Sequence, residues 1–247
     1  MVYDDNFKAK LRFLGIEYIE IPTSTGDNCL LYSPEANDAV LILPDDSDSI
    51  RFALSYKLEQ YLYSLSTNVE TLYIQGGKLL KTFDRSFNGL SIKKLNLEGV
   101  TAQHLISLAG AFESVEVQEI EFGNLNTKEV ASFVDMFYRA YIGSMNLSNF
   151  DYSSANDLEQ MFKYCVCKKL DMTNFDKFNK EHKASDRCYT SMFSNAQLNI
   201  KTDSKILRDI AEICEKQDET EERKYAYIYS PGYNIRNQNT RNKIMFV

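Results

Sequence analysis

The 247-residue sequence has no tryptophan and only 10 Gly, 4 Pro and 2 His. The scarcity of Gly and Pro excludes long low-complexity linkers. No apolar run approaches the ~20 residues of a transmembrane helix, which excludes a membrane span. The opening stretch MVYDDNFKAKLRFLGIEYIE also lacks the apolar run of a signal peptide. We therefore expect a cytoplasmic protein, or a cell-surface protein if a native leader is missing from this sequence.

Positive charge is also scarce, with 28 Lys and Arg against 35 Asp and Glu, which gives a net charge of −7. Domains that bind nucleic acid are normally basic, so direct contact with nucleic acid is disfavoured. An acidic protein is instead steered toward basic protein surfaces. Aromatic residues are abundant, with 15 Phe and 16 Tyr, and they are sufficient for a substantial core.

An internal repeat of 25 residues organises the middle of the chain. Its clearest marker is the pair Met161-Phe162. The stretches LEQYLYS and LEQMFKY, which begin at Leu58 and Leu158, match across four such periods. The sequence thus predicts about six stacked repeats. Equivalent pairs stand at Tyr61-Leu62, Ser86-Phe87, Ala111-Phe112, Met136-Phe137 and, after a longer interval of 31 residues, Met192-Phe193.

Apolar residues within each repeat follow two spacings. Leu158, Met161, Phe162 and Cys165 stand at i, i+3, i+4 and i+7, which predicts one short helix per repeat. The positions that follow have the alternation of a short strand. Each strand ends at a Gly or Asn, and stacked Asn side chains are expected to form a ladder of hydrogen bonds. This strand-end column comprises Gly76, Gly99, Asn124, Asn149 and Asn174.

Two stretches, MFYRAYIGSMNLSNFD at 136–151 and MFKYCVCKKLDMTNFD at 161–176, carry a family likeness. They resemble the BspA-like leucine-rich repeats, a group also known from mycoplasma surface proteins, and the likeness covers roughly residues 58–202. The resemblance implies an α/β fold, a leucine-rich-repeat-like solenoid with a parallel sheet on one face and short helices on the other. It also implies a surface adhesin or another protein-binding module, without catalytic residues.

The segments that flank the repeats are predicted to cover the two ends of the stack within one continuous domain. Residues 1–57 are expected to form a β-rich cap of three strands, of which 40–43 joins the repeat sheet. Residues 203–247 are expected to form a second cap, a helix with Asp203 and Ser204 as capping candidates. Two strands, KYAYIYSPGYNI and KIMFV, then follow around a Ser-Pro-Gly turn.

A zinc site is suggested by the spacing of Cys165 and Cys167, with His182 and Cys188 as further ligands. The first two cysteines, however, fall in columns where neighbouring repeats carry Leu, Val, Ala or Ile, and free Cys is a small, readily buried side chain. We therefore expect core cysteines with reduced thiols and neither metal nor other cofactor. A zinc-dependent enzyme is kept as a remote alternative.

Polar positions between the core columns of the strands face outward and predict a binding surface. At the start of two strands, Tyr141 stands beside Val166, which predicts a small apolar contact. A merely solvated face is the competing interpretation. The outward residues singled out are Tyr73, Asn96, Glu98, Glu121, Asn146 and Asp171.

Motifs for catalysis are missing from the sequence, which has no complete phosphate-binding loop and no nucleophile elbow. The favoured hypothesis is therefore a non-catalytic protein-protein interaction module of bacterial or phage origin. One version is an intracellular inhibitor of a basic protein such as a defence nuclease. The alternative is a surface adhesin-type repeat protein that binds host matrix proteins.

Overall fold

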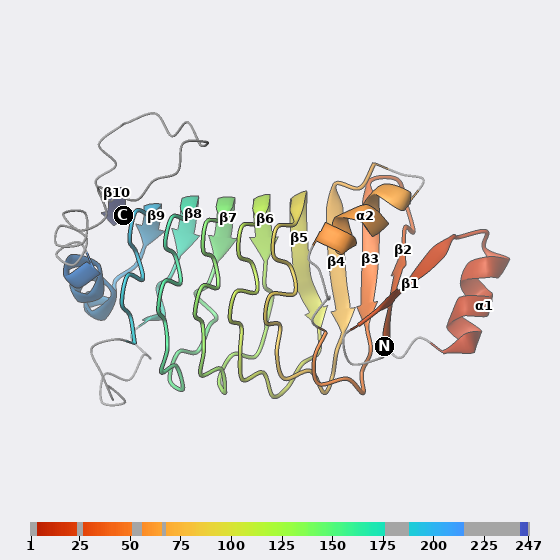
Figure 1. Cartoon of the computed structure of the whole chain (residues 1–247), viewed down its shortest axis with the longest axis horizontal. Coiled ribbons are helices and arrows are strands. Elements are labelled where there is room, and N and C mark those ends of the chain that lie inside the picture. Colours follow the sequence, from red (N-terminus) through yellow and green to blue (C-terminus); the bar gives the residue numbers. More distant parts are fainter. Residues whose placement is uncertain are drawn as a thin grey trace, which may run out of the picture.

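The computed structural model describes residues 4–23, 27–50, 56–65, 68–175, 188–214 and 243–246. It is a mixed α/β structure built on one open sheet of ten strands, which follow one another in chain order (Figure 1). Helices are few in this part of the chain: α1 (Asp5–Phe13), α2 (Tyr56–Ser64) and a helical segment over residues 205–214. The strands are β1 (Tyr18–Pro22), β2 (Asn28–Tyr32), β3 (Asp38–Leu43), β4 (Thr71–Gly76), β5 (Ser91–Val100), β6 (Glu116–Glu121), β7 (Tyr141–Asn146), β8 (Val166–Asp171), β9 (Gln197–Lys201) and β10 (Lys243–Phe246).

Strand pairing changes from antiparallel to parallel at β3. The pairs β1–β2 and β2–β3 are antiparallel, whereas each later pair from β3–β4 to β9–β10 is parallel. The register joins equivalent positions of the repeats, so that Val117 lies between Ile92 and Ile142. Each 25-residue repeat therefore contributes one strand to the sheet, at the position that its apolar alternation predicts.

The segments before strands β5 to β9 are turns, and the prediction of a short helix in each repeat is wrong for them. Alternate backbone N–H groups donate to the following repeat, as from Phe83 to the Ser107 oxygen at 3.2 Å and from Phe87 to the Ala111 oxygen at 2.9 Å. Most of the intervening groups donate three residues back, as from Ser86 to the Phe83 oxygen at 2.9 Å. A second ladder between repeats thus replaces the hydrogen bonds that a helix would make within itself.

Left-handed residues explain why a helical spacing occurs without a helix. Positive φ angles fall two residues before and two residues after the anchor Phe, as at Arg85 (53°) and Gly89 (73°), or Gln160 (56°) and Tyr164 (60°). A regular α-helix contains no such residues. The turn nevertheless buries side chains four positions apart, such as Phe83 and the anchor that follows it. The same apolar stripe is therefore compatible with either backbone.

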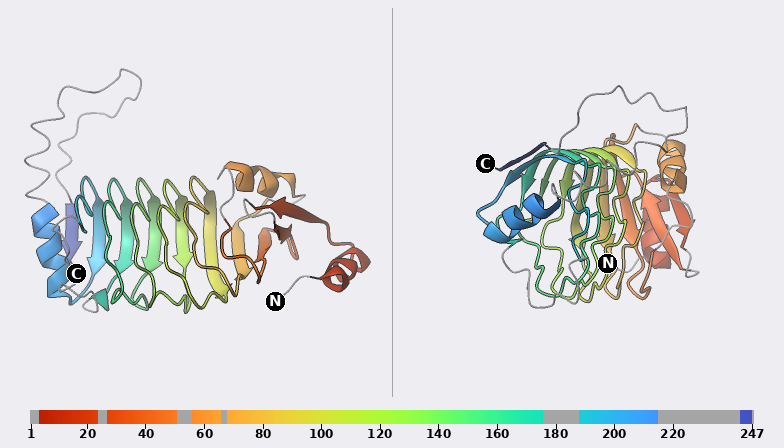
Figure 2. Two further views of the ribbon diagram at one scale, coloured as in Figure 1. Left: turned by 60° about the horizontal axis from the view of Figure 1, so that its bottom comes forward. Right: turned by 60° about the vertical axis from the view of Figure 1, so that its left-hand side comes forward.

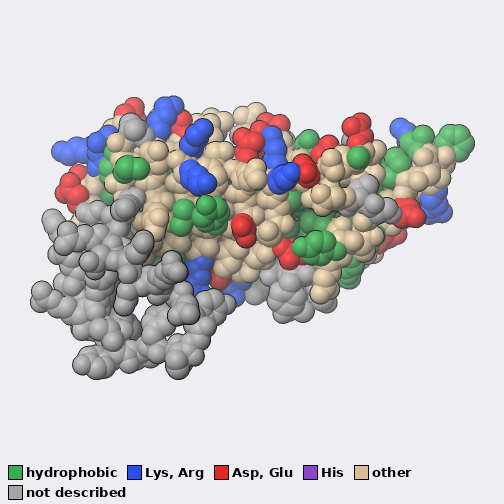
Figure 3. All heavy atoms as spheres, turned by 90° about the horizontal axis from the view of Figure 1, so that it is seen from above, with side chains coloured by type: hydrophobic (Ala, Val, Ile, Leu, Met, Phe, Trp, Pro, Cys, Tyr) green, Lys and Arg blue, Asp and Glu red, His purple; other side chains and the backbone are tan. Residues whose placement is uncertain are grey.

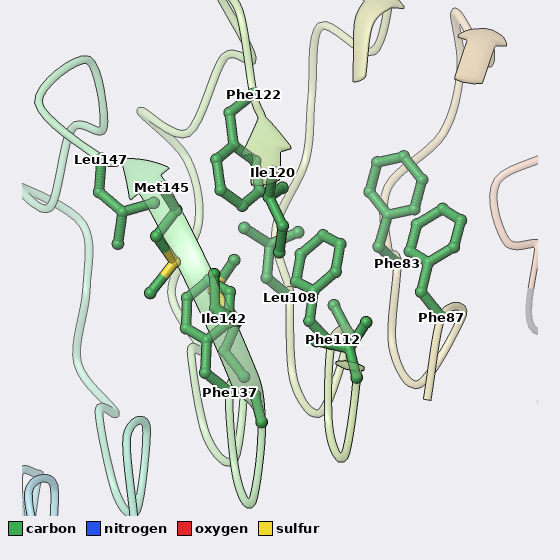
Figure 4. Close-up of a cluster of buried hydrophobic side chains, with 14 of the residues drawn as sticks. Phe83, Phe87, Leu108, Phe112, Ile120, Phe122, Phe137, Ile142, Met145 and Leu147 are labelled. Atoms are coloured by element: carbon green, nitrogen blue, oxygen red, sulfur yellow. The ribbon is translucent and has the colours of Figure 1, made fainter. Parts of the chain in front are cut away.

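The anchor phenylalanines form one continuous stack through the core. Neighbouring rings lie nearly parallel at centroid distances of 5.4 to 5.7 Å, which is a favourable separation for aromatic pairs. Figure 4 shows part of this stack, with Ile120 and Ile142 from the strands and Phe122, which directly follows β6, packed alongside. The stacked residues are Phe87, Phe112, Phe137, Phe162 and Phe193, none more than 1% exposed.

The strand-end column forms the predicted ladder at its last Asn positions. Asn149 Nδ2 donates to the Gly123 oxygen at 3.4 Å, and Asn174 Nδ2 donates to the Ser148 oxygen at 2.5 Å. Each amide therefore ties its repeat to the preceding one. At the start of the column, Gly76 has a φ of 84°, and a Cβ there would lie 2.7 Å from a backbone oxygen of β3. A larger residue would be strained at this turn.

The N-terminal end of the sheet contains the three strands expected within residues 1–57, and β3 pairs in parallel with β4 as predicted for 40–43. Helix α1 has no counterpart among the predicted elements and lies beyond β1 (Figure 1). Asp4 caps this helix, because its Oδ1 accepts a hydrogen bond from the Phe7 N–H at 2.8 Å.

The opposite end of the sheet is covered by the helical segment 205–214 (Figure 2). Of the two predicted capping residues, Ser204 accepts a hydrogen bond from the Leu207 N–H at 3.1 Å. The predicted strand KIMFV is present as β10, which pairs in parallel with β9. The other predicted strand, KYAYIYSPGYNI at 224–235, lies outside the described residues.

Replacing Phe137 by alanine should lower the free energy of unfolding by about 3–5 kcal/mol, because the cavity would interrupt the ring stack between Phe112 and Phe162. Urea denaturation followed by circular dichroism measures this. The control is Leu79→Ala, at a side chain that is 51% exposed, where a change within ~0.5 kcal/mol is expected. Equal effects of the two substitutions would contradict a central role for the stack.

Candidate functional site

A shallow groove of about 620 Å³ lies on the outward face of strands β5 to β9. Four of the six outward residues singled out from the sequence line it: Glu98, Glu121, Asn146 and Asp171. The parallel register brings them together, because neighbouring strands lie only ~4.8 Å apart and Asn146 pairs directly with Asp171. The structure therefore assembles part of the predicted surface into one concave site.

Other polar residues of the groove were missed from the sequence. Glu119, Ser144 and Lys169 occupy one register column, two positions before the column of Glu121 and Asp171. Extending the same outward alternation by one step would have identified them. The remaining polar lining comes from Asn149, Asn199 and Lys201.

Asn96 does not belong to the exposed surface as predicted, because its side chain is buried. Its Nδ2 donates to Glu121 Oε2 at 2.6 Å, and its Oδ1 accepts from the Glu98 N–H at 2.9 Å. Glu121 Oε1 also lies 2.7 Å from Lys94 Nζ, and this hydrogen bond and its charge raise the pKa of Lys94. Asn96 thus orients Glu121 within the sheet face.

The charge of Asp171 is likewise compensated. Burial alone would raise its pKa, but hydrogen bonds from Lys201 and Thr173 outweigh burial, and the pKa of Asp171 is lowered. Lys201 Nζ lies 2.7 Å from Asp171 Oδ2. Glu98, in contrast, is exposed, and no ion pair within the described part of the chain involves its carboxylate. Glu98 is therefore the acidic group of the groove most open to a partner.

The other predicted contact residues lie outside the groove. Tyr73 is half-buried and packs against a small apolar cluster of the N-terminal strands. Tyr141 and Val166 are register partners at the starts of β7 and β8, as expected from their columns, and Tyr141 is 46% exposed. These two residues therefore mark the edge of the sheet where its strands begin.

That edge also holds a cluster that the sequence analysis did not single out. Tyr138 and Tyr164 are in edge-to-face contact, with ring centroids 5.8 Å apart. The Arg139 guanidinium lies 5.0 Å from the Tyr138 centroid and 5.8 Å from that of Tyr164. These residues occupy the first and second positions after the anchor Phe, columns in which the other repeats carry one aromatic side chain, Tyr63 of the first repeat.

Cys165 and Cys167 are core residues, as their repeat columns predict, with exposures of 0% and 1%. Burial raises the pKa of both thiols, to about 11 for Cys167. His182 lies outside the described residues. Within the part of the chain that the structure describes, no group of three His, Cys, Asp or Glu side chains is arranged to hold a metal ion, and no helix is long and apolar enough to cross a membrane.

The fold and groove together define a class of protein: an α/β repeat protein in which strand-bearing repeats build one open sheet with a polar outer face. Residues 79–205, more than half of the chain, match the model of a family described as "Mycoplasma protein of unknown function, DUF285". The chain belongs to this family. No curated protein and no solved structure matches the chain.

Lys201→Gln should raise the pKa of Asp171, because the lysine that offsets the effect of burial on this carboxyl would be gone. The lowered pKa of this carboxyl contributes stability that is present above its unfolded-state pKa and lost as the pH falls through the folded-state value. The variant should lose part of this contribution, at most ~1 kcal/mol for such an exposed pair. Carbon-13 NMR titration of the carboxyl measures the pKa. An unchanged Asp171 titration would contradict this account, and Lys128→Gln is the control.

Cys165 and Cys167 should react with a thiol reagent at least ~100-fold more slowly in the native protein than after unfolding, because burial hinders both ionisation and access. The rates can be assigned to each cysteine by peptide mass spectrometry. Rapid native labelling of Cys167 would show that its thiol is accessible and would revive the zinc hypothesis.

Proposed function

We propose that this protein is a non-catalytic protein-protein interaction module whose repeats form a leucine-rich-repeat-like solenoid of the BspA-like type. The observation that carries the proposal is the groove across β5 to β9, where residues of five successive strands form one polar concave surface. Stacked repeats commonly use such extended faces to bind proteins. The groove is rimmed by carboxylates, amides and two lysines, which suit hydrogen bonds and ion pairs with another protein.

The charge of the groove favours a basic partner. Glu98, Glu119, Glu121 and Asp171 line it against Lys169 and Lys201, and the whole chain has a net charge of −7. Long-range attraction would therefore steer a positively charged protein toward this face. In the favoured version the protein acts inside a bacterial cell as an inhibitor of a basic, nucleic-acid-handling protein such as a defence nuclease.

A second candidate is a surface adhesin-type repeat protein that binds host matrix proteins. Membership of a family described from Mycoplasma favours it, because the repeats resemble those of mycoplasma surface proteins. The two candidates differ in partner and compartment, and both use the groove as the contact surface.

Glu98→Lys should weaken partner binding at least ~10-fold, because it reverses the accessible charge of the groove without removing an ion pair. Glu35→Lys is the matched control, since it makes the same charge change at an exposed residue of the β2–β3 connection. Tagged wild-type and variant proteins are immobilised and exposed at two salt concentrations to host lysate and, in parallel, to a mixture of matrix and serum proteins.

The proteins retained are identified by mass spectrometry, and the affinity of each is then measured by titration with the purified protein. The inhibitor is supported if the wild type retains a basic intracellular protein that Glu98→Lys does not retain and that is released at high salt. The adhesin is supported if matrix proteins are retained. Equal binding by Glu98→Lys and Glu35→Lys would remove the groove as the contact site.

A further inference from the structure

Tyrosine rings and cations of two neighbouring repeats gather on the edge of the sheet where strands β7 and β8 begin. Figure 3 looks down on this edge and shows Lys and Arg side chains beside side chains of the hydrophobic class, in which Tyr is included. We name the cluster the tyrosine–cation edge. It consists of Tyr138, Arg139, Tyr141, Lys163, Tyr164 and Lys168.

The cations of this edge are held over the faces of the rings. Besides the Arg139 contacts, Lys163 Nζ lies 5.8 Å from the Tyr164 centroid, and Lys168 Nζ lies 5.7 Å from the Tyr141 centroid. Ring faces attract cations, whereas ring edges carry partial positive charge. A partner thus meets ammonium and guanidinium groups, ring edges and tyrosine hydroxyls, and all of these favour an anion.

The way in which the rings are covered argues against single-stranded nucleic acid as the partner. Proteins bind its bases by stacking them on open aromatic faces. Here each of the three rings already has a cation within 6 Å of its centroid, so one face of each ring is engaged within the chain. The surface therefore suits carboxylates better than bases.

The charges beside the cluster limit the length of the anion. In the preceding repeat, Glu116 pairs in register with Tyr141, and Glu113 occupies the column of Tyr138. In the following repeat the same columns hold the uncharged Gln197 and Ser194. Because strands are only ~4.8 Å apart, a long polyanion running across the repeats would soon meet these carboxylates. A short anionic segment would avoid Glu113 and Glu116, and the carboxylate that it would approach near Lys163 is that of the half-buried Asp135.

We infer that the tyrosine–cation edge binds a short acidic segment of a protein partner. This inference rests on the proposed protein-binding function and deepens it by adding a second surface of opposite charge to the groove. A partner with a basic face and a neighbouring acidic segment would contact both. Net charge cannot account for such binding, because a protein of −7 repels acidic peptides as a whole.

The test measures binding of fluorescein-labelled octaglutamate to the full chain by fluorescence anisotropy. We expect binding that weakens as salt is raised. The triple variant Arg139→Gln, Lys163→Gln, Lys168→Gln should bind at least ~10-fold more weakly. A second triple variant, Lys78→Gln, Lys128→Gln, Lys205→Gln, removes the same charge at exposed residues elsewhere and should stay within ~2-fold of wild type. Thermal unfolding verifies that all three proteins are folded.

Three results would overturn the inference: no measurable binding of octaglutamate, equal losses in the two triple variants, or tighter binding of octathymidylate or a heparin octasaccharide than of octaglutamate. The last result would identify the edge as a nucleic-acid or sulfated-glycan site. Glu98→Lys should leave octaglutamate binding intact. If octaglutamate does not bind while Glu98→Lys still weakens capture of the protein partner, the inference about the edge is wrong and the proposed function of the groove stands.

Discussion

Hydrogen bonding between successive repeats, through their strands and through the turns before β5 to β9, is the constraint on which the rest of this structure depends. On one side the strands form a parallel ladder, and on the other the turns form a second one. Buried backbone N–H and C=O groups must be paired, and the turns pair every second N–H group only through a neighbouring repeat. A single repeat could not satisfy its own backbone, so the repeats must fold as a stack.

The fixed spacing of the stack arranges side chains in columns. Inside, this produces the stack of phenylalanine rings from Phe87 to Phe193. A cavity at one position would therefore remove contacts from the repeats on both sides. Outside, it places residues 25 positions apart in direct contact, as in the bond from Asn96 to Glu121. The environment of an outward side chain therefore depends more on residues 25 positions away in the sequence than on the residues next to it.

The sequence predicts those features of this structure that depend on side-chain type better than those that depend on backbone hydrogen bonding. Strands and the Asn ladder were predictable because side-chain type reports directly which face is buried or which turn is formed. The turn ladder was mistaken for helices because Leu158, Met161, Phe162 and Cys165 have the same spacing in both, and the backbone groups that differ leave little trace in side-chain periodicity. Gly89 and Gly110, at left-handed positions, were a partial signal. Asn96 was expected to be exposed, but its buried side chain is hydrogen-bonded to Glu121 of the neighbouring strand.

Net charge describes the whole chain and not its surfaces. The core columns remain mostly apolar along the stack, with Ser86 and Thr202 as buried polar exceptions, whereas the outward column at the strand starts changes from Ser91 and Glu116 to Tyr141, Val166 and Gln197. Each step along the stack can thus present different chemistry without disturbing the core. An acidic groove on the sheet face and a cationic edge at the strand starts can therefore coexist on the same repeats, at different positions along their strands. The position of a residue within its repeat and along the stack, more than the composition of the chain, determines what that part of the surface can bind.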